Sequence, residues 1–376
     1  MEEQQKDNAS NSISYYFSNL EDSRRTDKGN FTHLLSDIIL LVITGVLCGG
    51  DKWETIHIFG ESQEDWLKEY GSFSNGIPSI DTMRRVFSSI DPDQFNSCFI
   101  SWANHLCTKT EGEIVAIDGK TVRGAKCDGM VTPHIISAFA SENQLCLGQL
   151  KVDHKSNEIT AIPILLKLLD IQGNIVTLDA MGCQTKIVEQ IIESKANYII
   201  AVKGNQPTLE KNIQDTISLA HPSTIDIQES FGHGRIEKRT CSVYKNLTHI
   251  EAKDKWSNLS SVIKITTEVI QKSSNTKTIE ERFYISDIDV ASTINKGIRS
   301  HWSVENNLHW SLDVTFQEDT SKKRIRNQVE NFNMITKIVL SILTKENTTK
   351  ISLKNKRMKA AFDVSYRNKL MNLKVF

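Results

Sequence analysis

The sequence predicts an α/β protein in which a small all-helical domain precedes a larger domain built on a mixed sheet. Apolar residues recur at helical spacing between residues 31 and 110. From Glu111 onward, short apolar runs typical of strands alternate with amphipathic helical segments. A chain of 376 residues is long enough for two domains and a substantial core. Together these patterns indicate two domains of different structural class.

The first part of the chain divides into a tail and a group of helices. Residues 1–30 are rich in Asn, Ser, Glu and Lys, so we expect a flexible polar tail. Residues 31–110 form the helical N-terminal domain, in which Ser79 or Asp81 begins one helix and Asp91, before Pro92, begins another. The expected helices cover HLLSDIILLVITGVLC, WETIHIFGESQEDWLKEYG, SIDTMRRVFSSI and DPDQFNSCFISWANHL.

Residues 111–376 form the second domain. EIVAIDG and HIISAFAS…CLGQLKV predict three strands, the last two joined as a hairpin at SENQ. The next segments predict, in order, a helix, a strand, a helix, a strand and a helix, namely EITAIPILLKLLD, NIVTLDA, CQTKIVEQIIESK, NYIIAVKG and TLEKNIQDTISLA. This order is that of the ribonuclease H-like fold, a mixed sheet covered by helices on both faces. A β-rich insertion at about 225–285 and a basic helical region at 322–376 complete the domain.

Several features of the composition limit the class of protein. The most apolar segment, Ile38–Gly50, is too short to span a bilayer, so we expect no membrane attachment. The opening MEEQQKDNAS is polar and acidic, unlike a signal peptide. The seven cysteines are scattered and contain no C-x-x-C, which predicts reduced thiols instead of disulfides or a zinc cluster. We therefore expect a cytoplasmic protein.

The charge is unevenly distributed along the chain. The net charge is −1, yet residues 322–376 contain 14 Lys and Arg against 3 Asp and Glu. This asymmetry indicates a polyanion as partner, with a solvated helix face as the alternative.

The stretch EIVAIDGKTVRGA contains a GKT triplet that could end a phosphate-binding loop. Ile114 stands where such a loop needs its first glycine, so this interpretation is excluded. The run instead predicts a strand that delivers Asp118 to the edge of a sheet, and IVTLD places Asp179 in the same way. An ionised carboxylate is costly inside an apolar sheet, which favours these strand ends. The alternative is that each aspartate only caps the following turn.

A third acid lies in the helical segment RSHWSVENNLHWSLD. His301, Glu305 and His309 fall on one face of a helix, and Trp302 and Trp310 are interpreted as core residues. Two aspartates and one glutamate form a set of hard oxygen ligands that suits two Mg²⁺ or Mn²⁺ ions in phosphoryl transfer. Zinc held by the two histidines and Glu305 is an alternative.

The sequence resembles insertion-sequence transposases of the DDE class, in the H-repeat-associated (Rhs-element-associated) group. The segments that carry the resemblance span about residue 15 to the end: GIPSIDTMRRVF, AIDGKTVRGA, VTLDAMGCQ, IIAVKGNQPTL, FGHGRIEKR, RSHWSVENNLHWSLDVTFQED and KAAFDVSYRNKLMNL. The resemblance implies a catalytic triad of Asp118, Asp179 and Glu305, two divalent ions, and cleavage and transfer of DNA strands. The broader class has Tyr, Arg and Lys around its glutamate, where this chain has Ile298, His301 and Leu312.

Further residues are expected to contact DNA. Lys203 and Gln206 in VKGNQ follow a strand and could instead form a polar turn. The run KKRIR could contact phosphates or be a solvated helix start. The complete expected set is Lys120, Arg123, Lys203, Gln206, His233, Arg235, Arg299, His301, Lys323, Arg324 and Arg326.

These features predict a DNA transposase that cleaves transposon ends and joins them to target DNA. The expected partner is double-stranded DNA, bound by a homodimer that associates with the nucleoid when it acts. One alternative is a ribonuclease H-like DNA nuclease that does not join ends. The other is a non-catalytic DNA-binding protein descended from a transposase.

Overall fold

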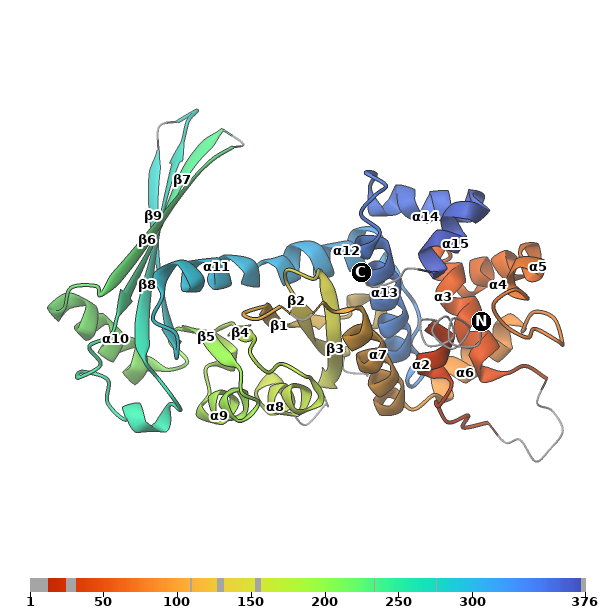
Figure 1. The fold of residues 1–376 in the computed structure, drawn as a ribbon, viewed down its shortest axis with the longest axis horizontal. Coiled ribbons are helices and arrows are strands. Elements are labelled where there is room, and N and C mark those ends of the chain that lie inside the picture. Colours follow the sequence, from red (N-terminus) through yellow and green to blue (C-terminus); the bar gives the residue numbers. More distant parts are fainter. Residues whose placement is uncertain are drawn as a thin grey trace, which may run out of the picture.

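The computed structural model describes residues 13–24, 32–108, 110–126, 132–152, 157–232, 234–274 and 276–372. The molecule is elongated, and three parts follow one another along its long axis (Figure 1). Helices from both ends of the chain occupy one end, and a sheet covered by helices forms the middle. A long four-stranded arm projects at the other end and continues the sheet of the middle part.

The N-terminal helices begin where the sequence predicts. Ser79 accepts a hydrogen bond from the Thr82 N–H at 3.2 Å, and Asp91 caps the helix that starts at Pro92. These side chains satisfy backbone N–H groups that a first helical turn leaves unpaired. The helices of this part are α2 (Ile13–Phe17), α3 (Leu35–Leu47), α4 (Trp53–Ser62), α5 (Glu64–Leu67), α6 (Ile80–Ser89) and α7 (Pro92–Leu106).

One boundary differs from the expectation drawn from the sequence. The polar composition predicts a tail over residues 1–30, but Ile13, Phe17 and Leu20 are buried in the core. Phe17, on α2, packs against Phe95 of α7 with ring centroids 5.1 Å apart. Apolar side chains four residues apart on a short helix thus join the tail to the helical domain.

Nine strands form one mixed sheet in the order β3-β2-β1-β4-β5-β9-β8-β7-β6. β1 pairs antiparallel with β2, and β2 with β3, whereas β1, β4 and β5 are parallel. This is the ribonuclease H-like arrangement that the order of segments predicts. The five strands are β1 (Ile114–Thr121), β2 (His134–Ala140), β3 (Leu145–Val152), β4 (Ile175–Leu178) and β5 (Asn197–Val202).

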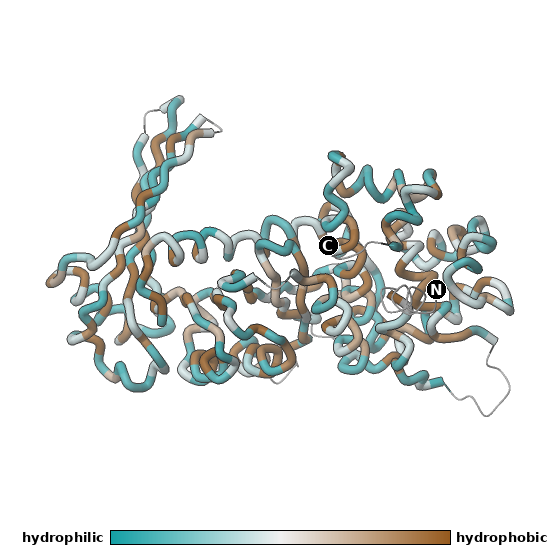
Figure 2. Tube along the Cα trace, viewed as in Figure 1, coloured by the Kyte–Doolittle hydropathy of each residue, from teal (hydrophilic) through white to brown (hydrophobic). Residues whose placement is uncertain are grey.

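Helices cover both faces of these five strands (Figure 1). α8 and α9 lie on one face, while α11 contacts β1, β4 and β5 from the other. Apolar segments run through the sheet and through α3 and α13, as Figure 2 shows, because both strand faces are buried. The helices are α8 (Glu158–Leu168), α9 (Thr185–Glu193), α10 (Pro207–Leu219), α11 (Ala291–His301), α12 (Trp310–Val314) and α13 (Gln328–Lys345).

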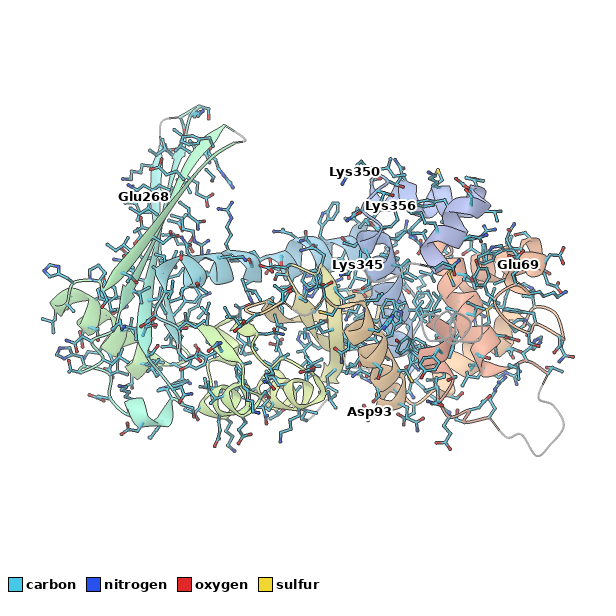
Figure 3. The ribbon with its side chains drawn as sticks, viewed as in Figure 1. Glu69, Asp93, Glu268, Lys345, Lys350 and Lys356 are labelled. Atoms are coloured by element: carbon cyan, nitrogen blue, oxygen red, sulfur yellow. The ribbon has the colours of Figure 1, made fainter. Side chains whose placement is uncertain are left out.

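The β-rich insertion is part of the same sheet. Its strands are β6 (Thr224–Gly232), β7 (Arg235–Tyr244), β8 (Ser261–Gln271) and β9 (Lys277–Ser286). β9 pairs antiparallel with β5, from Ile199 opposite Ser286 to Val202 opposite Phe283. Glu268, labelled in Figure 3, lies far out on this arm. The sequence does not reveal β6, because its side chains are mostly exposed and its apolar pattern is correspondingly weak.

The basic C-terminal region packs against the N-terminal helices. Its last helices are α14 (Leu353–Phe362) and α15 (Val364–Met371), and Lys356 on α14 is labelled in Figure 3. The side chains of Lys337, Lys356, Arg357 and Arg367 are buried. Arg367, for example, donates to Gln63 Oε1 at 2.5 Å. Several of the basic side chains of residues 322–376 therefore bind groups inside the protein. The excess of Lys and Arg in this region does not by itself identify a surface that binds a polyanion.

Within the described part of the chain, no helix combines the length and apolarity needed to cross a bilayer. Six of the seven cysteines are free thiols: Cys48, Cys98, Cys107, Cys146, Cys183 and Cys241. Cys127 lies outside the described residues. The prediction of unpaired thiols is confirmed for those six.

Candidate active site

Asp118, Asp179 and Glu305 line one cavity of about 340 Å³. They come from three separate elements: β1, the residue after β4, and the helical segment after α11. β9 of the arm forms the opposite wall of this cavity with Arg282 and other side chains. The three acids that the sequence singles out are therefore brought to one place.

Asp118 lies on β1 directly opposite Ser137 of β2. Residues paired in this way point to the same face of the sheet, so Asp118 faces α11 and the segment that carries Glu305. Burial raises the pKa of Asp118 to about 7, and the carboxylates of Asp179 and Glu305 contribute to this. His309 Nδ1 lies 3.4 Å from Asp118 Oδ2. Asp118 is thus a half-buried acid at a site where negative charge accumulates.

Asp179 follows β4 and begins the short 3₁₀ helix η2 (Ala180–Gly182). Its Oδ1 accepts hydrogen bonds from the Met181 and Gly182 N–H groups at 3.0 and 3.3 Å. The alternative role as a turn cap is therefore real, but the same side chain also lines the cavity. Burial raises its pKa, while those N–H groups act in the opposite direction.

The loop after β5 braces the loop that carries Asp179. Asn205 Nδ2 donates to the Ala180 carbonyl at 2.6 Å, and Gln206 Nε2 donates to the Cys183 carbonyl at 2.8 Å. Lys203 from the same loop is exposed and lines the cavity. Gln206 thus holds the turn, as the alternative interpretation proposes, and Lys203 is the residue of this loop that remains available to a ligand.

Glu305 lies in a π-helical segment, η4 (Val304–His309), and not in the regular α-helix that the spacing predicts. A π-turn inserts an extra residue into a helix, and such turns are frequent at functional sites. The Glu305 side chain is exposed, while its neighbours Val304 and Leu308 are buried against the core. The wider turn therefore presents the carboxylate to the cavity and still packs the apolar residues beside it.

The two histidines of this segment are used within the protein. His301 Nδ1 is 3.0 Å from Thr177 Oγ1 of β4, and burial lowers the pKa of His301 to about 4. Burial also lowers the pKa of His309 to about 3. His301 lines the cavity as a neutral group, and it binds the sheet. Because each imidazole faces a different strand residue, the arrangement does not support zinc shared with Glu305.

Two lysines expected to contact DNA are engaged in internal contacts in this structure. Lys120 Nζ lies 2.5 Å from Asp313 Oδ1 and 2.6 Å from Glu318 Oε2. Lys323 is buried, donates to the Asp51 carbonyl at 2.7 Å, and lies over the Phe332 ring. Both ammonium groups face the interior because carboxylates, carbonyls and rings surround them there.

The other expected DNA contacts are dispersed. Arg123, Arg299, Arg324 and Arg326 are exposed, and Arg324 also donates to the Gly124 carbonyl at 3.2 Å. Arg235 stands at the start of β7, near the end of the arm, beside Glu237 at 3.6 Å. His233 lies outside the described residues. Among the members of the expected set that the structure describes, Lys203 and His301 are the ones that line the cavity.

The two tryptophans interpreted as core residues are not buried. Trp302 is 39% exposed and lines the cavity, and Trp310 is 58% exposed. The Arg282 guanidinium lies over the Trp302 ring, 5.3 Å from its centroid. The error arises because large aromatic side chains are usually buried, and the sequence alone does not show that these two lie at a cavity wall or at the surface.

A further pair of residues near the acids has no counterpart among the residues that the sequence singles out. Glu158 at the start of α8 contacts His134 Nε2, and His134 Nδ1 is 2.9 Å from Thr121 Oγ1. A Cβ atom on Gly119 would lie within 2.4 Å of both side chains, so a larger residue beside Asp118 would have to displace them. Glu158 also raises the pKa of Asp118 and Asp179. Glu158 is the first residue of α8, and no motif in the sequence marks it as a neighbour of the two aspartates.

The donor chemistry of the site suits a hard cation. Three carboxylates line the cavity, and their mutual repulsion contributes to the raised pKa of Asp118, which a divalent ion would offset. Within the described residues, however, no three His, Cys, Asp or Glu side chains converge closely enough to hold a metal ion. The oxygen ligands of Asp118, Asp179 and Glu305 are thus of the type that a divalent cation prefers, and binding of the ion would draw these side chains closer together.

Comparisons with known proteins agree with this architecture. A family model described as "DDE_Tnp_1-associated" matches residues 14–103, and one described as "Transposase DDE domain" matches residues 109–342. The chain is 41% identical to "H repeat-associated putative transposase YhhI" of Escherichia coli K12, over 93% of this chain and 95% of that protein. It is 40% identical to "Putative transposase YncI" of Escherichia coli O157:H7, over 93% and 92%.

A solved structure of the piggyBac transposase synaptic complex with hairpin DNA is also similar, with a TM-score of 0.44 and 12% sequence identity. The likeness covers 98% of this chain and 80% of that chain.

Proposed function

The chain belongs to the transposase DDE domain family, and from this membership we propose that it cleaves transposon ends and transfers the cut strands into target DNA. The observation that carries the proposal is the meeting of Asp118, Asp179 and Glu305 at one cavity from three separate elements. A set of acids that only capped turns would have no reason to share a cavity wall.

We propose that these carboxylates hold two Mg²⁺ or Mn²⁺ ions. Such ions supply activation of the attacking oxygen and stabilisation of the leaving oxygen in an in-line displacement at phosphorus. Asp118 is held by its strand, Asp179 by two backbone N–H groups, and Glu305 by a turn whose apolar residues are buried. The chain therefore fixes the directions from which its three ligands approach.

Lys203 is proposed to bind a phosphate oxygen of the DNA strand in the cavity. It is exposed, lies on the wall beside Asp179, and comes from a loop braced by Asn205 and Gln206. A cation on a rigid loop can fix the position of the backbone without reading its sequence. Double-stranded DNA is the proposed partner, and a homodimer is proposed because transposition must hold two ends together.

The test is a strand-transfer assay with Mg²⁺, a duplex that carries the element's own terminal repeats, and a supercoiled target plasmid. Joined products that require Asp118, Asp179 and Glu305 are expected. Cleavage without joining would indicate a ribonuclease H-like nuclease. DNA binding without metal-dependent cleavage would indicate a non-catalytic descendant and would overturn the proposal.

A further inference from the structure

A row of buried polar side chains lies directly behind Asp118. On the sheet, Asp118 of β1 is opposite Ser137 of β2, and Ser137 is opposite Gln149 of β3. Residues opposite each other in antiparallel strands share a face, so the three side chains form one line across the sheet. Ser137 and Gln149 are each 1% exposed. This line begins at the cavity and leads into the interior.

Lys337 of α13 covers the inner end of this row. Its side chain is buried, and Nζ donates to Ser137 Oγ and to Gln149 Oε1, both at 2.7 Å. A buried ammonium group is costly, and burial lowers the pKa of Lys337. These contacts therefore hold a buried ammonium group on Ser137, the residue directly opposite the proposed catalytic acid Asp118.

His309 connects the same region to the catalytic helical segment. Its ring is mostly buried, with Nδ1 3.4 Å from Asp118 Oδ2, while Nε2 is buried without a hydrogen-bond partner among the described residues. It follows Glu305 by four residues in the same π-helical segment. His309 thus joins the strand that carries the first acid to the segment that carries the third.

The groups around this pair are themselves fixed. Lys120 is bound between Asp313 and Glu318, and Asn333 of α13 contacts Glu318. These contacts tie the segment that follows His309 to β1, which carries Asp118, and to α13, which carries Lys337. Replacing buried polar groups by apolar residues of similar volume is often neutral or stabilising, so folding stability alone does not account for this network.

We propose that His309 and Lys337 are positioning residues for Asp118. The imidazole lies beside Oδ2 on the helical side, and the Asp118 carboxylate lines the cavity. The ammonium group fixes Ser137 and Gln149, the row of side chains beside Asp118, from the interior. This inference rests on the proposed function, because it assigns the pair to the orientation of a carboxylate that binds a divalent ion.

A positioning role and a purely electrostatic role for Lys337 predict opposite effects on metal binding. A nearby cation repels Mn²⁺, so if Lys337 acted only through its charge, its removal would tighten binding. If it acts by positioning, its removal loosens Asp118 and weakens binding. Loss of residues that orient metal ligands typically weakens metal affinity about 10–100-fold.

The experiment measures the affinity of the full chain for Mn²⁺ alone by electron paramagnetic resonance, beside the melting temperature. Lys337→Met and His309→Phe are each expected to raise the Mn²⁺ dissociation constant about 10–100-fold. His309→Gln, which restores an N–H donor, is expected to recover part of the affinity. Because both residues act on one carboxylate, the combined effect of the double variant is expected to be smaller than the product of the two single effects.

Lys356→Met is the matched control. Lys356 lies on α14, is also buried, and donates to the Leu343 carbonyl at 2.8 Å. It does not line the cavity that contains the three acids. It is expected to lower the melting temperature and leave Mn²⁺ binding unchanged. His309→Phe keeps the test decisive if Lys337→Met fails to fold.

Asp118→Asn separates this inference from the proposed function. Mn²⁺ binding that does not depend on Asp118 overturns the proposed function and this inference with it. Binding that depends on Asp118 but is unchanged or tighter in His309→Phe and Lys337→Met overturns the inference alone.

Discussion

Arg357 on α14 donates from Nη2 to Asp51 Oδ1 at 2.5 Å, joining residues more than three hundred positions apart in the chain. The same guanidinium donates to the Val46 carbonyl at 2.8 Å and to the Thr315 carbonyl at 2.6 Å. One side chain therefore binds the end of α3, the loop before α4 and the segment after α12. Planar guanidinium groups suit such multiple contacts, because their N–H donors point in fixed directions.

Arg357→Met is expected to destabilise the whole protein. Removing one partner of a buried ion pair leaves an uncompensated carboxylate and several unpaired carbonyls, which typically costs about 3–5 kcal/mol. Urea unfolding should show one cooperative transition at a lower midpoint. Lys354→Met, on the same helix but exposed, is the control and should leave the midpoint unchanged. An unchanged midpoint for Arg357→Met would show that the two ends of the chain are not coupled.

Lys323→Met is expected to stabilise the protein at neutral pH. Burial lowers the pKa of Lys323 from 10.5 to about 8, so the unfolded state binds more protons between these values. The destabilisation by the buried charge is thus fully present below pH 8 and disappears as the pH rises through about 10.5. Each tenfold change in proton affinity is worth about 1.4 kcal/mol, so the gain at pH 7 is at most about 3 kcal/mol.

The hydrogen bond to the Asp51 carbonyl and the packing on the Phe332 ring disappear in this variant, which reduces the gain. The measurement is the difference in unfolding free energy between variant and wild type from pH 7 to pH 10.5. A difference that stays constant across this range would contradict the assignment of a depressed pKa to Lys323.

The basic run at residues 322–326 is expected to contribute to DNA binding only through its exposed members. Arg324→Gln and Arg326→Gln together should reduce the slope of log affinity against log salt by about 0.9 for each phosphate that is no longer neutralised. Lys323→Met should not change the slope, because its ammonium group is buried. Filter binding or fluorescence anisotropy over a salt series measures this slope. A slope changed by Lys323→Met, but not by the arginine variants, would reverse the assignment.

Asp118→Asn, Asp179→Asn and Glu305→Gln are each expected to abolish cleavage in Mg²⁺. A site with two metal ions loses its geometry when any one carboxylate is removed. DNA affinity should persist, since phosphate contacts elsewhere supply most of it. The melting temperature should hold or rise, because the acids repel one another. Near-normal cleavage by Asp118→Asn would show that Asp118 is a structural residue of β1 and takes no part in catalysis.

Elements with a strong local pattern could be predicted from the sequence. The caps at Ser79 and Asp91 satisfy backbone groups in their own turn, so they are visible without the fold. The strands that carry Asp118 and precede Asp179 are apolar runs that end in an acid, and their order predicts the sheet. Local chemistry and hydrophobic period therefore define the sheet and place the two aspartates at neighbouring strands.

Contacts between distant segments could not be predicted in this way. Lys120 and Lys323 are cationic residues in segments that suggest phosphate binding. The carboxylates and rings that surround them are visible only in the folded structure. The π-turn at Glu305 has no period of its own in the sequence, so it could not be predicted. The exposure of Trp302 and Trp310 could not be predicted either, because aromatic side chains are usually buried. His309 and Lys337 gain their significance from Asp118, which is far from both in the chain.

The hydrogen-bonded seam between β5 and β9 makes the arm an extension of the catalytic sheet. Four consecutive residue pairs, Ile199–Ser286 to Val202–Phe283, join the two regions. One ladder of backbone hydrogen bonds therefore runs from the outer hairpins of the arm to β4 and β1, which place Asp179 and Asp118. A DNA strand in the cavity would thus meet the insertion and the two aspartates on the same sheet.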